Sequence, residues 1–208
     1  MLNRIWFILL SLSSVISACK STIRTEKELY KWINDKDNGL VQEKTTNGFT
    51  LTAKYLPAEL LAYREYESDK TVPFNKVLEN YKKNKTFLMS IKVDTATRHT
   101  GNILFQDAEG YAGYKQRILS FNFGLEEMVS LNYSEKKYKP VLYTLENTFH
   151  IVDGKNVYLV FNIDSLKKQN KQDEMDLVFE DVHFSTGITH FQFKVTDLQN
   201  IPKIELSK

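Results

Sequence analysis

The chain has 208 residues, a length that suits one domain of ordinary size or two small ones. Its 42% hydrophobic and 26% charged residues are typical of a globular protein, and they exclude a disordered chain, which needs fewer apolar residues and a larger net charge. The net charge of +2 excludes the basic footprint of a nucleic-acid-binding protein, and the single cysteine excludes an internal disulfide.

The N-terminal stretch MLNRIWFILLSLSSVISAC has the organisation of an export signal. Arg4 provides the positive charge, and residues 5–18 form an apolar run of 14 residues, too few to cross about 30 Å of hydrocarbon as a helix. Ordinary signal cleavage prefers small residues at positions −3 and −1, whereas Ile16 and Ala18 occupy these positions before Cys19. An uncleaved anchor helix and a secreted protein with an unmodified thiol are therefore the weaker alternatives.

The tetrapeptide ISAC, residues 16–19, resembles the lipobox of bacterial lipoproteins: a branched aliphatic residue, two small residues and a cysteine. The resemblance implies a signal peptide over residues 1–18, cleavage between Ala18 and Cys19, and a Cys19 that carries diacylglycerol and usually an amide-linked acyl chain. Two or more acyl chains anchor a protein stably, because each buried CH₂ contributes about 0.8 kcal/mol. Cys19 is therefore the predicted lipidation site, and the membrane is a predicted partner.

Residues 19–24 form the predicted tether between the lipid and the folded domain. The five residues KSTIR reach at most about 18 Å when extended, so we expect the domain close to the bilayer. Lys20 follows the cysteine, and the first acidic residue is Glu26. This pattern resembles the outer-membrane default of proteobacterial lipoproteins and lacks the early acidic residues of surface-exposed Bacteroidota lipoproteins. We therefore expect an outer-membrane protein that faces the periplasm.

Residues 25–208 are expected to form a single α+β domain that begins with short helices and strands. Thr25 and Glu28 form a capping box at the start of the first helix, and Asn47-Gly48 is a strong signal for a β-hairpin. Apolar periodicity predicts helices over 25–35, 57–68 and 72–84, and strands over 49–55 and 86–93.

Residues 106–121 are ambiguous at the level of sequence. Tyr111, Tyr114 and Ile118 keep helical spacing, whereas Gly110 and Gly113 each cost about 1 kcal/mol inside a helix. The pattern therefore leaves open whether this segment is a helix or a loop.

From about residue 126 the pattern is that of short strands separated by turns. Strands are predicted over 127–133, 139–147, 156–163, 175–182, 188–195 and, at the edge of the sheet, 201–206. Asp153-Gly154 marks a second hairpin. The expected fold class is α+β: an antiparallel β-rich domain, either a sandwich or a curled sheet, with the helices before residue 125 packed on it and the signal peptide in front.

His183 and His190 flank the sequence FSTG, which is typical of a hairpin turn. If Thr186-Gly187 is a two-residue loop, the two histidines pair across the strands. A three-residue loop instead places His190 opposite Val182, and this slip changes the face on which a side chain lies. In either register, the alternation with Phe191, Phe193 and Val195 puts His190 on the solvent side.

Candidate catalytic chemistry is weak in this sequence. A metal site at these two histidines needs a third ligand, and the nearest choices are Asp181 and Glu180, with a spacing that matches no metal signature. His150 and Asp153 suit the orientation of a base, but no nucleophile motif accompanies them once Cys19 is lipidated. We therefore expect no metal, no cofactor and no enzymatic activity.

Four tyrosines lie in or beside weakly predicted helices: Tyr63, Tyr66, Tyr111 and Tyr114. One interpretation is an exposed aromatic patch that binds a ligand. The other is that these side chains pack against the sheet, as aromatic residues of β-rich domains commonly do.

Three segments resemble parts of uncharacterised small lipoproteins from Bacteroidota: WINDKDNGLVQEKTTNG, YLPAELLAYRE and FEDVHFSTGITHFQFKVTDLQNIPKIEL. The resemblance covers about half of the mature chain and implies a location more than an activity. The leading hypothesis is a membrane-anchored envelope lipoprotein with a non-catalytic interaction or scaffolding role toward another envelope protein. The alternatives are a ligand- or glycan-binding lipoprotein that uses the surface aromatics and, third, a hydrolase.

Overall fold

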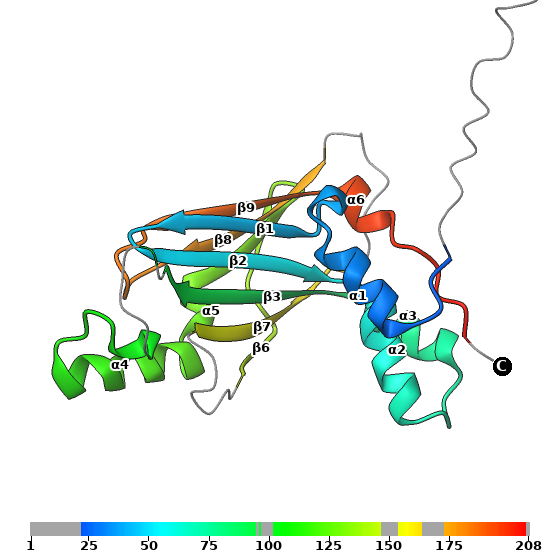
Figure 1. The fold of residues 1–208 in the computed structure, drawn as a ribbon, viewed down its shortest axis with the longest axis horizontal. Helices are drawn as coiled ribbons and strands as arrows, with labels where there is room; N and C mark the ends of the chain where they lie inside the picture. Colours follow the sequence, from blue (N-terminus) through cyan, green and yellow to red (C-terminus); the bar gives the residue numbers. More distant parts are fainter. Residues whose placement is uncertain (1–21, 95, 97–101, 147–153, 164–172, 207–208) are drawn as a thin grey trace, which may run out of the picture.

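The computed structural model describes residues 22–94, 96, 102–146, 154–163 and 173–206. Within them, nine strands form two antiparallel sheets, which confirms the predicted α+β class (Figure 1). The five-stranded sheet has the order β1-β2-β3-β7-β6, and the four-stranded sheet has the order β5-β4-β8-β9. The strands are β1 (Val41–Thr46), β2 (Phe49–Leu56), β3 (Asn84–Val93), β4 (Val129–Tyr133), β5 (Lys136–Tyr138), β6 (Leu142–Leu145), β7 (Gly154–Asn162), β8 (Glu174–Glu180) and β9 (Ile188–Lys194).

The first hairpin forms where the sequence predicts it. Asn47 and Gly48 both have positive φ, at 47° and 73°, as the two central residues of a tight hairpin turn require. The turn sets the register of β1 against β2, with Thr46 opposite Phe49. The Asn47 side-chain amide also donates to the carbonyl of Phe184 at 2.9 Å, so this turn contacts the loop that connects β8 to β9.

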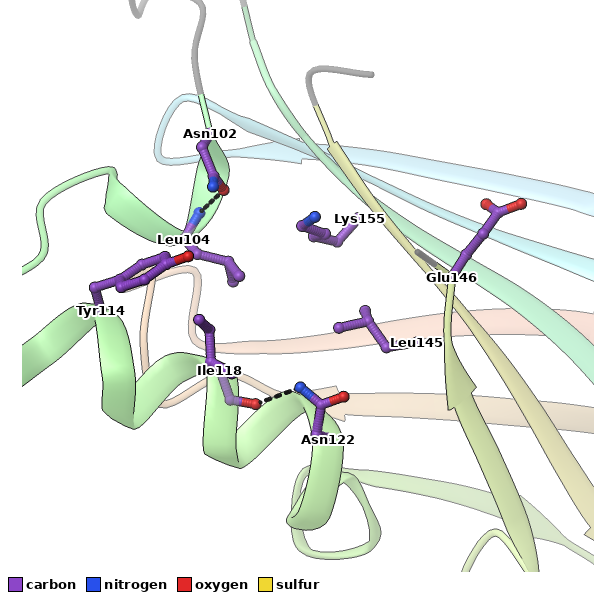
Figure 2. Close-up of a pocket in the computed structure, with 8 residues that line it drawn as sticks. All are labelled: Asn102, Leu104, Tyr114, Ile118, Asn122, Leu145, Glu146 and Lys155. Carbon is purple, nitrogen blue, oxygen red and sulfur yellow. Dashed lines mark hydrogen bonds between the residues drawn. The ribbon is translucent and has the colours of Figure 1, made fainter. Parts of the chain in front are cut away.

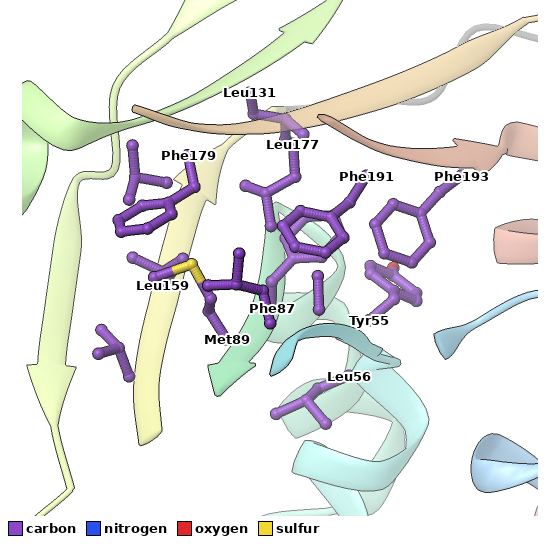
Figure 3. Close-up of a cluster of buried hydrophobic side chains, with 14 of the residues drawn as sticks. Tyr55, Leu56, Phe87, Met89, Leu131, Leu159, Leu177, Phe179, Phe191 and Phe193 are labelled. Carbon is purple, nitrogen blue, oxygen red and sulfur yellow. The ribbon is translucent and has the colours of Figure 1, made fainter. Parts of the chain in front are cut away.

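The two sheets face each other through a core that is rich in phenylalanine (Figure 3). Phe87 on β3 lies at its centre, with ring centroids 5.3 Å from Phe193 on β9 and 6.0 Å from Phe161 on β7. All three rings are fully buried. Because alternate residues of a strand point to one face, the period-two pattern of the sequence places these rings between the sheets. The architecture is therefore a sandwich.

The helices lie at the two ends of this sandwich (Figure 1). The expectation that they pack on the sheet is thus refined, because the front face of the five-stranded sheet in Figure 1 carries no helix. One end carries α1 (Glu26–Asn34), the 3₁₀ turn η1 (Lys36–Asn38), α2 (Ala58–Ser68), α3 (Phe74–Lys82) and α6 (Val195–Gln199). The other end carries the 3₁₀ turn η2 (Ile103–Phe105), α4 (Gly110–Phe123) and α5 (Leu125–Met128).

The first helix begins as predicted. The Thr25 hydroxyl accepts a hydrogen bond from the Glu28 backbone N–H at 3.2 Å and caps α1. Leu29 and Ile33, one turn apart, are fully buried and join the core. The helix therefore closes its end of the sandwich with a single apolar face.

The ambiguous segment is helical from Gly110 onward, where it forms α4. Gly110, with φ of 65°, is the first residue of α4, so it lies where the chain enters the helix and not in its interior. The helix forms despite its glycines because its inner face packs two buried side chains, Arg117 and Phe121, against the end of the sandwich.

Arg117 holds α4 in place. Its side chain is only 6% exposed, and the guanidinium lies 4.9 Å from the centre of the Phe184 ring. The guanidinium donates to four backbone carbonyls, those of Leu104, Gln106, Asp107 and His183. These carbonyls belong to η2, to the segment that leads into α4, and to the β8–β9 loop. One buried cation thus joins α4 and the segment before it to the β8–β9 loop, which is 66 residues away in the sequence.

The C-terminal segment differs from the prediction. Residues 201–206 form no strand, and Ile204 makes a single parallel bridge to Ile23. The backbone of Ile23 is bonded on both sides, by its N–H to Lys203 and by its carbonyl to Glu205. No helix among the described residues is long and apolar enough to cross a membrane.

We predict that Arg117→Gln destabilises the protein. The shorter neutral side chain leaves several buried carbonyls without a donor, which costs about 2–4 kcal/mol in the free energy of unfolding. Urea denaturation followed by circular dichroism measures this loss. Lys115→Gln, at an exposed position of the same helix, is the matched control and changes stability little. A loss as small as that of the control would show that Arg117 does not hold α4.

Lowering the pH should reduce the stability of the folded protein through protonation of His183, which lies beside Arg117. Its Nε2 atom is buried and has no hydrogen-bond partner within the described ranges. Burial lowers the pKa of His183 below its ordinary value of 6.5, the Arg117 charge lowers it further, and Asp181 opposes both. The unfolded chain therefore binds a proton more readily, so stability falls as the pH decreases through about 6.5.

We expect the free energy of unfolding to decrease between about pH 7 and about pH 5, and His183→Asn to reduce this decrease. Urea titrations of the native and variant proteins at both pH values measure the difference. Equal pH dependence in the two proteins would contradict the assignment to His183.

Candidate functional site

The predicted lipidation site lies outside the described residues. The same holds for the cleavage position at Ala18 and Cys19, and for His150 and Asp153 of the hydrolase hypothesis. The described residue nearest to Cys19 that is fixed by contacts is Ile23, which is buried and hydrogen-bonded to the C-terminal segment.

The four predicted tyrosines do not form one surface. Tyr63 and Tyr66 lie on α2, whereas Tyr111 and Tyr114 lie on α4, at the opposite end of the sandwich (Figure 1). Tyr66 packs edge-on against Phe74 of α3, with ring centroids 5.8 Å apart, and serves the contact between two helices. A single patch of all four is therefore excluded, because the sandwich lies between the two pairs.

The two histidines are not cross-strand partners, and both predicted registers are wrong. His190 on β9 lies opposite Val178 on β8, whereas His183 lies in the loop of residues 181–187 that connects these two strands. Asp181 explains this longer loop, because its carboxylate accepts hydrogen bonds from four donors within the loop: the N–H groups of His183, Phe184 and Thr186, and the Thr186 hydroxyl. The FSTG sequence is thus folded around a carboxylate and is not a two- or three-residue turn.

His190 makes a different contact. Its Nδ1 lies 2.8 Å from Oδ2 of Asp176, on the solvent side of β8 and β9, as the alternation along the strand predicts. In the part of the chain that the structure describes, no three His, Cys, Asp or Glu side chains are grouped to hold a metal ion.

A cavity of about 370 Å³ lies beside His190, between the β1 and β9 edges of the two sheets. Its charged side chains are Lys36, Lys44, Lys194, Asp37, Glu174 and Asp197. Three cations and three anions balance one another, so this cavity has no electrostatic preference for an ionic ligand.

A second cavity, of about 270 Å³, lies between α4 and the β6–β7 end of the five-stranded sheet (Figure 2). We call it the α4 cavity; its lining residues are Asn102, Leu104, Tyr114, Ile118, Asn122, Leu145, Glu146 and Lys155. Tyr114, Ile118 and Asn122 are spaced by four residues and so project from one face of α4. Leu145 on β6 points toward Ile118 across the cavity.

The α4 cavity has one ordered polar wall. The Asn156 amide donates to Oε2 of Glu146 at 2.6 Å, and Oδ1 of Asn156 accepts from the Ser90 hydroxyl at 2.7 Å. These two hydrogen bonds in series hold the Glu146 carboxylate on the sheet side of the cavity. On the helix side, the Asn122 amide donates to the Ile118 carbonyl at 2.8 Å, which leaves its side-chain oxygen free to accept.

Tyr114 continues the α4 cavity into an exposed aromatic cluster. Its ring stacks on Phe105 of η2, with centroids 3.7 Å apart and an interplanar angle of 9°, and Tyr111 follows at 6.2 Å. Phe105 is 53% exposed and Tyr111 is 75% exposed. We call Phe105, Tyr111 and Tyr114 the aromatic shelf. Two of the four tyrosines named in the sequence analysis, Tyr111 and Tyr114, therefore lie together in the aromatic shelf, next to the α4 cavity.

Sequence reasoning missed most of the α4 cavity. Leu145 is the last residue of β6, Glu146 follows it, and Lys155 is the second residue of β7. None of the three belongs to a recognisable sequence motif. If residues 110–123 are taken as a helix, the four-residue spacing of Tyr114, Ile118 and Asn122 predicts that they share one face. This spacing is the one sequence signal that could have identified the helical wall of the cavity.

Comparisons with known proteins add little. No family model matches the chain, and a search of curated proteins finds no match. Among solved structures, the chain is similar to a protein of unknown function from Burkholderia pseudomallei, at 9% sequence identity and a TM-score of 0.40. The alignment covers 85% of this chain and 89% of that one.

Proposed function

We propose that this chain is a lipid-anchored protein of the bacterial cell envelope and that its folded domain binds another envelope component without catalysing a reaction. The lipobox-like ISAC sequence supports the anchor, with Cys19 as the lipidated residue. Lys20 supports the outer membrane, with the domain on the periplasmic side.

The observation that carries the proposal is how early the chain becomes fixed to the fold. Ile23 is buried and hydrogen-bonded to Lys203 and Glu205, at 3.0 and 2.8 Å. Ile23 is only four positions after Cys19, and four Cα-to-Cα steps span at most about 14 Å in any conformation. A lipid on Cys19 therefore keeps Ile23 within this distance of the bilayer surface.

This geometry orients the domain in the proposal. Ile23 comes two residues before Thr25, the N-cap of α1, and α4 lies at the opposite end of the sandwich from α1 (Figure 1). With the α1 end next to the bilayer, the α4 cavity and the aromatic shelf point away from the membrane. They are then accessible to other components of the periplasm.

Binding of a small ligand or a glycan is the more specific version of this role. The observation that favours it is a cavity with polar and apolar walls beside exposed aromatic rings. Binding of an envelope protein needs the same exposed face. A hydrolase has less support, because the His183 ring nitrogen Nε2 is buried and the Asp181 carboxylate is occupied by loop donors.

We predict that Cys19→Ser abolishes acylation, because a hydroxyl does not replace the thiol that receives the diacylglycerol in lipoproteins. Cells grown with an alkyne-labelled fatty acid should incorporate label into the native protein and not into the variant. The variant should also leave the membrane fraction or retain its signal peptide.

Ser21→Ala, two residues beyond the cysteine, is the matched control and should be labelled normally. Labelled Cys19→Ser that still sediments with membranes would refute lipid anchoring at this residue.

A further inference from the structure

The α4 cavity has two kinds of wall. Leu104, Ile118 and Leu145 provide apolar surface, and the remaining lining residues are polar or carry a polar group. A ligand that fills it must therefore present both C–H surface and hydrogen-bonding groups. A wholly apolar molecule would strip water from Lys155 and Glu146 without replacing their hydrogen bonds, which is costly.

Several polar groups of the α4 cavity remain available to a ligand. Among the described residues, the Lys155 ammonium and the Tyr114 hydroxyl make no hydrogen bond or ion pair. Lys155 lies between Asn102 and Glu146 at one side of the cavity in Figure 2, and the Tyr114 hydroxyl points toward Leu104. With the free oxygen of Asn122, the cavity offers both donors and acceptors.

The charges of the α4 cavity argue against a compact ion. Lys155 is its one cation and Glu146 its one anion, so a phosphate or sulfate near Lys155 also meets a carboxylate across the same small space. Such an ion would leave the three apolar side chains uncovered. Hydroxyl groups suit this lining better, because each of them donates to a carboxylate or amide oxygen and accepts from an amine.

The aromatic shelf extends the site beyond the cavity. Its stacked pair, Phe105 and Tyr114, is held in place by the fold, since Arg117 bonds the carbonyls of Leu104 and Gln106 on either side of Phe105. Tyr111 adds a ring that is three-quarters exposed. Rigid exposed rings beside a polar cavity provide flat surface for the C–H face of a ring-shaped ligand at little entropic cost.

We propose that the α4 cavity and the aromatic shelf bind an oligosaccharide, with one sugar ring in the cavity and at least one more over the shelf. A sugar combines hydroxyl edges with C–H faces, as the lining demands. The cavity, at about 270 Å³, is slightly smaller than the usual ligand pocket of about 300 Å³ or more, so it holds a single ring and the rest of the oligosaccharide lies over Phe105 and Tyr111. The inference deepens the proposed function and rests on it for the source of the glycan, which is the cell envelope.

Isothermal titration calorimetry on the full-length protein tests this site. The protein is kept in a detergent without a sugar headgroup, and the probes are chitotriose, cellotriose and maltotriose with the corresponding monosaccharides. We expect at least one trisaccharide to bind more tightly than its monosaccharide, because only the longer ligand reaches the aromatic shelf.

Two variants test the two parts of the site. Lys155→Met should weaken trisaccharide binding about tenfold, through the loss of a charge-assisted hydrogen bond. Tyr111→Ala should weaken trisaccharide binding about fivefold and leave monosaccharide binding unchanged. Lys136→Met on β5 and Tyr66→Ala on α2 are the matched controls, at exposed and partly buried positions outside the site, and should bind like the native protein.

The proposal is overturned if none of the three trisaccharides binds at millimolar concentration, or if the controls lose binding as much as the site variants. It is also overturned if Tyr111→Ala abolishes capture of a crosslinked envelope protein while no saccharide binds, since the shelf is then a protein-binding face. Cys19→Ser should bind the same trisaccharide as the native protein. The acylation proposal and the sugar-binding proposal can therefore be refuted independently of each other.

Discussion

The packing of Phe87 between the two sheets is the contact on which this fold depends. Its ring touches Tyr55 in its own sheet at 5.4 Å and Phe193 in the facing sheet at 5.3 Å. A strand that is apolar on one face has to bury that face, and neither sheet can do so alone. The helices follow from this constraint, because they close the two ends that the sheets leave open.

At the α4 end, closure requires an unusual device, a buried arginine that is held by backbone carbonyls. Burial lowers the pKa of Arg117, and the charges of Asp107 and Asp181 partly offset this effect. Removing a cation from water is costly, and four carbonyl acceptors offset the cost by satisfying its donors. The same bonds position η2 and α4, which are two walls of the α4 cavity. The proposed binding site therefore depends on a contact made for stability.

The two ends of the molecule suit two different tasks in the function that we propose. In this proposal the α1 end follows the tether, and the few residues between Cys19 and Ile23 leave the domain little freedom to turn away from the bilayer. The α4 end carries the cavity and the exposed rings of Phe105 and Tyr111. A fold that separates attachment from recognition in this way allows both to operate at once.

The sequence by itself determined the local structure, including the capped helix at Thr25, the hairpin at Asn47-Gly48 and the buried faces of the strands, because these depend on residues close together in the chain. Only the tertiary structure decided the conformation of the loop around Asp181, the helical state of residues 110–123 and the set of residues that line the α4 cavity. The helix and the cavity depend on donors, acceptors and apolar surfaces that come from distant segments. The bonds to Asp181 are local, but Asn47 and Arg117 join this loop to the facing sheet and to α4. These long-range partners meet only after the two sheets have packed, so the local sequence pattern records them incompletely.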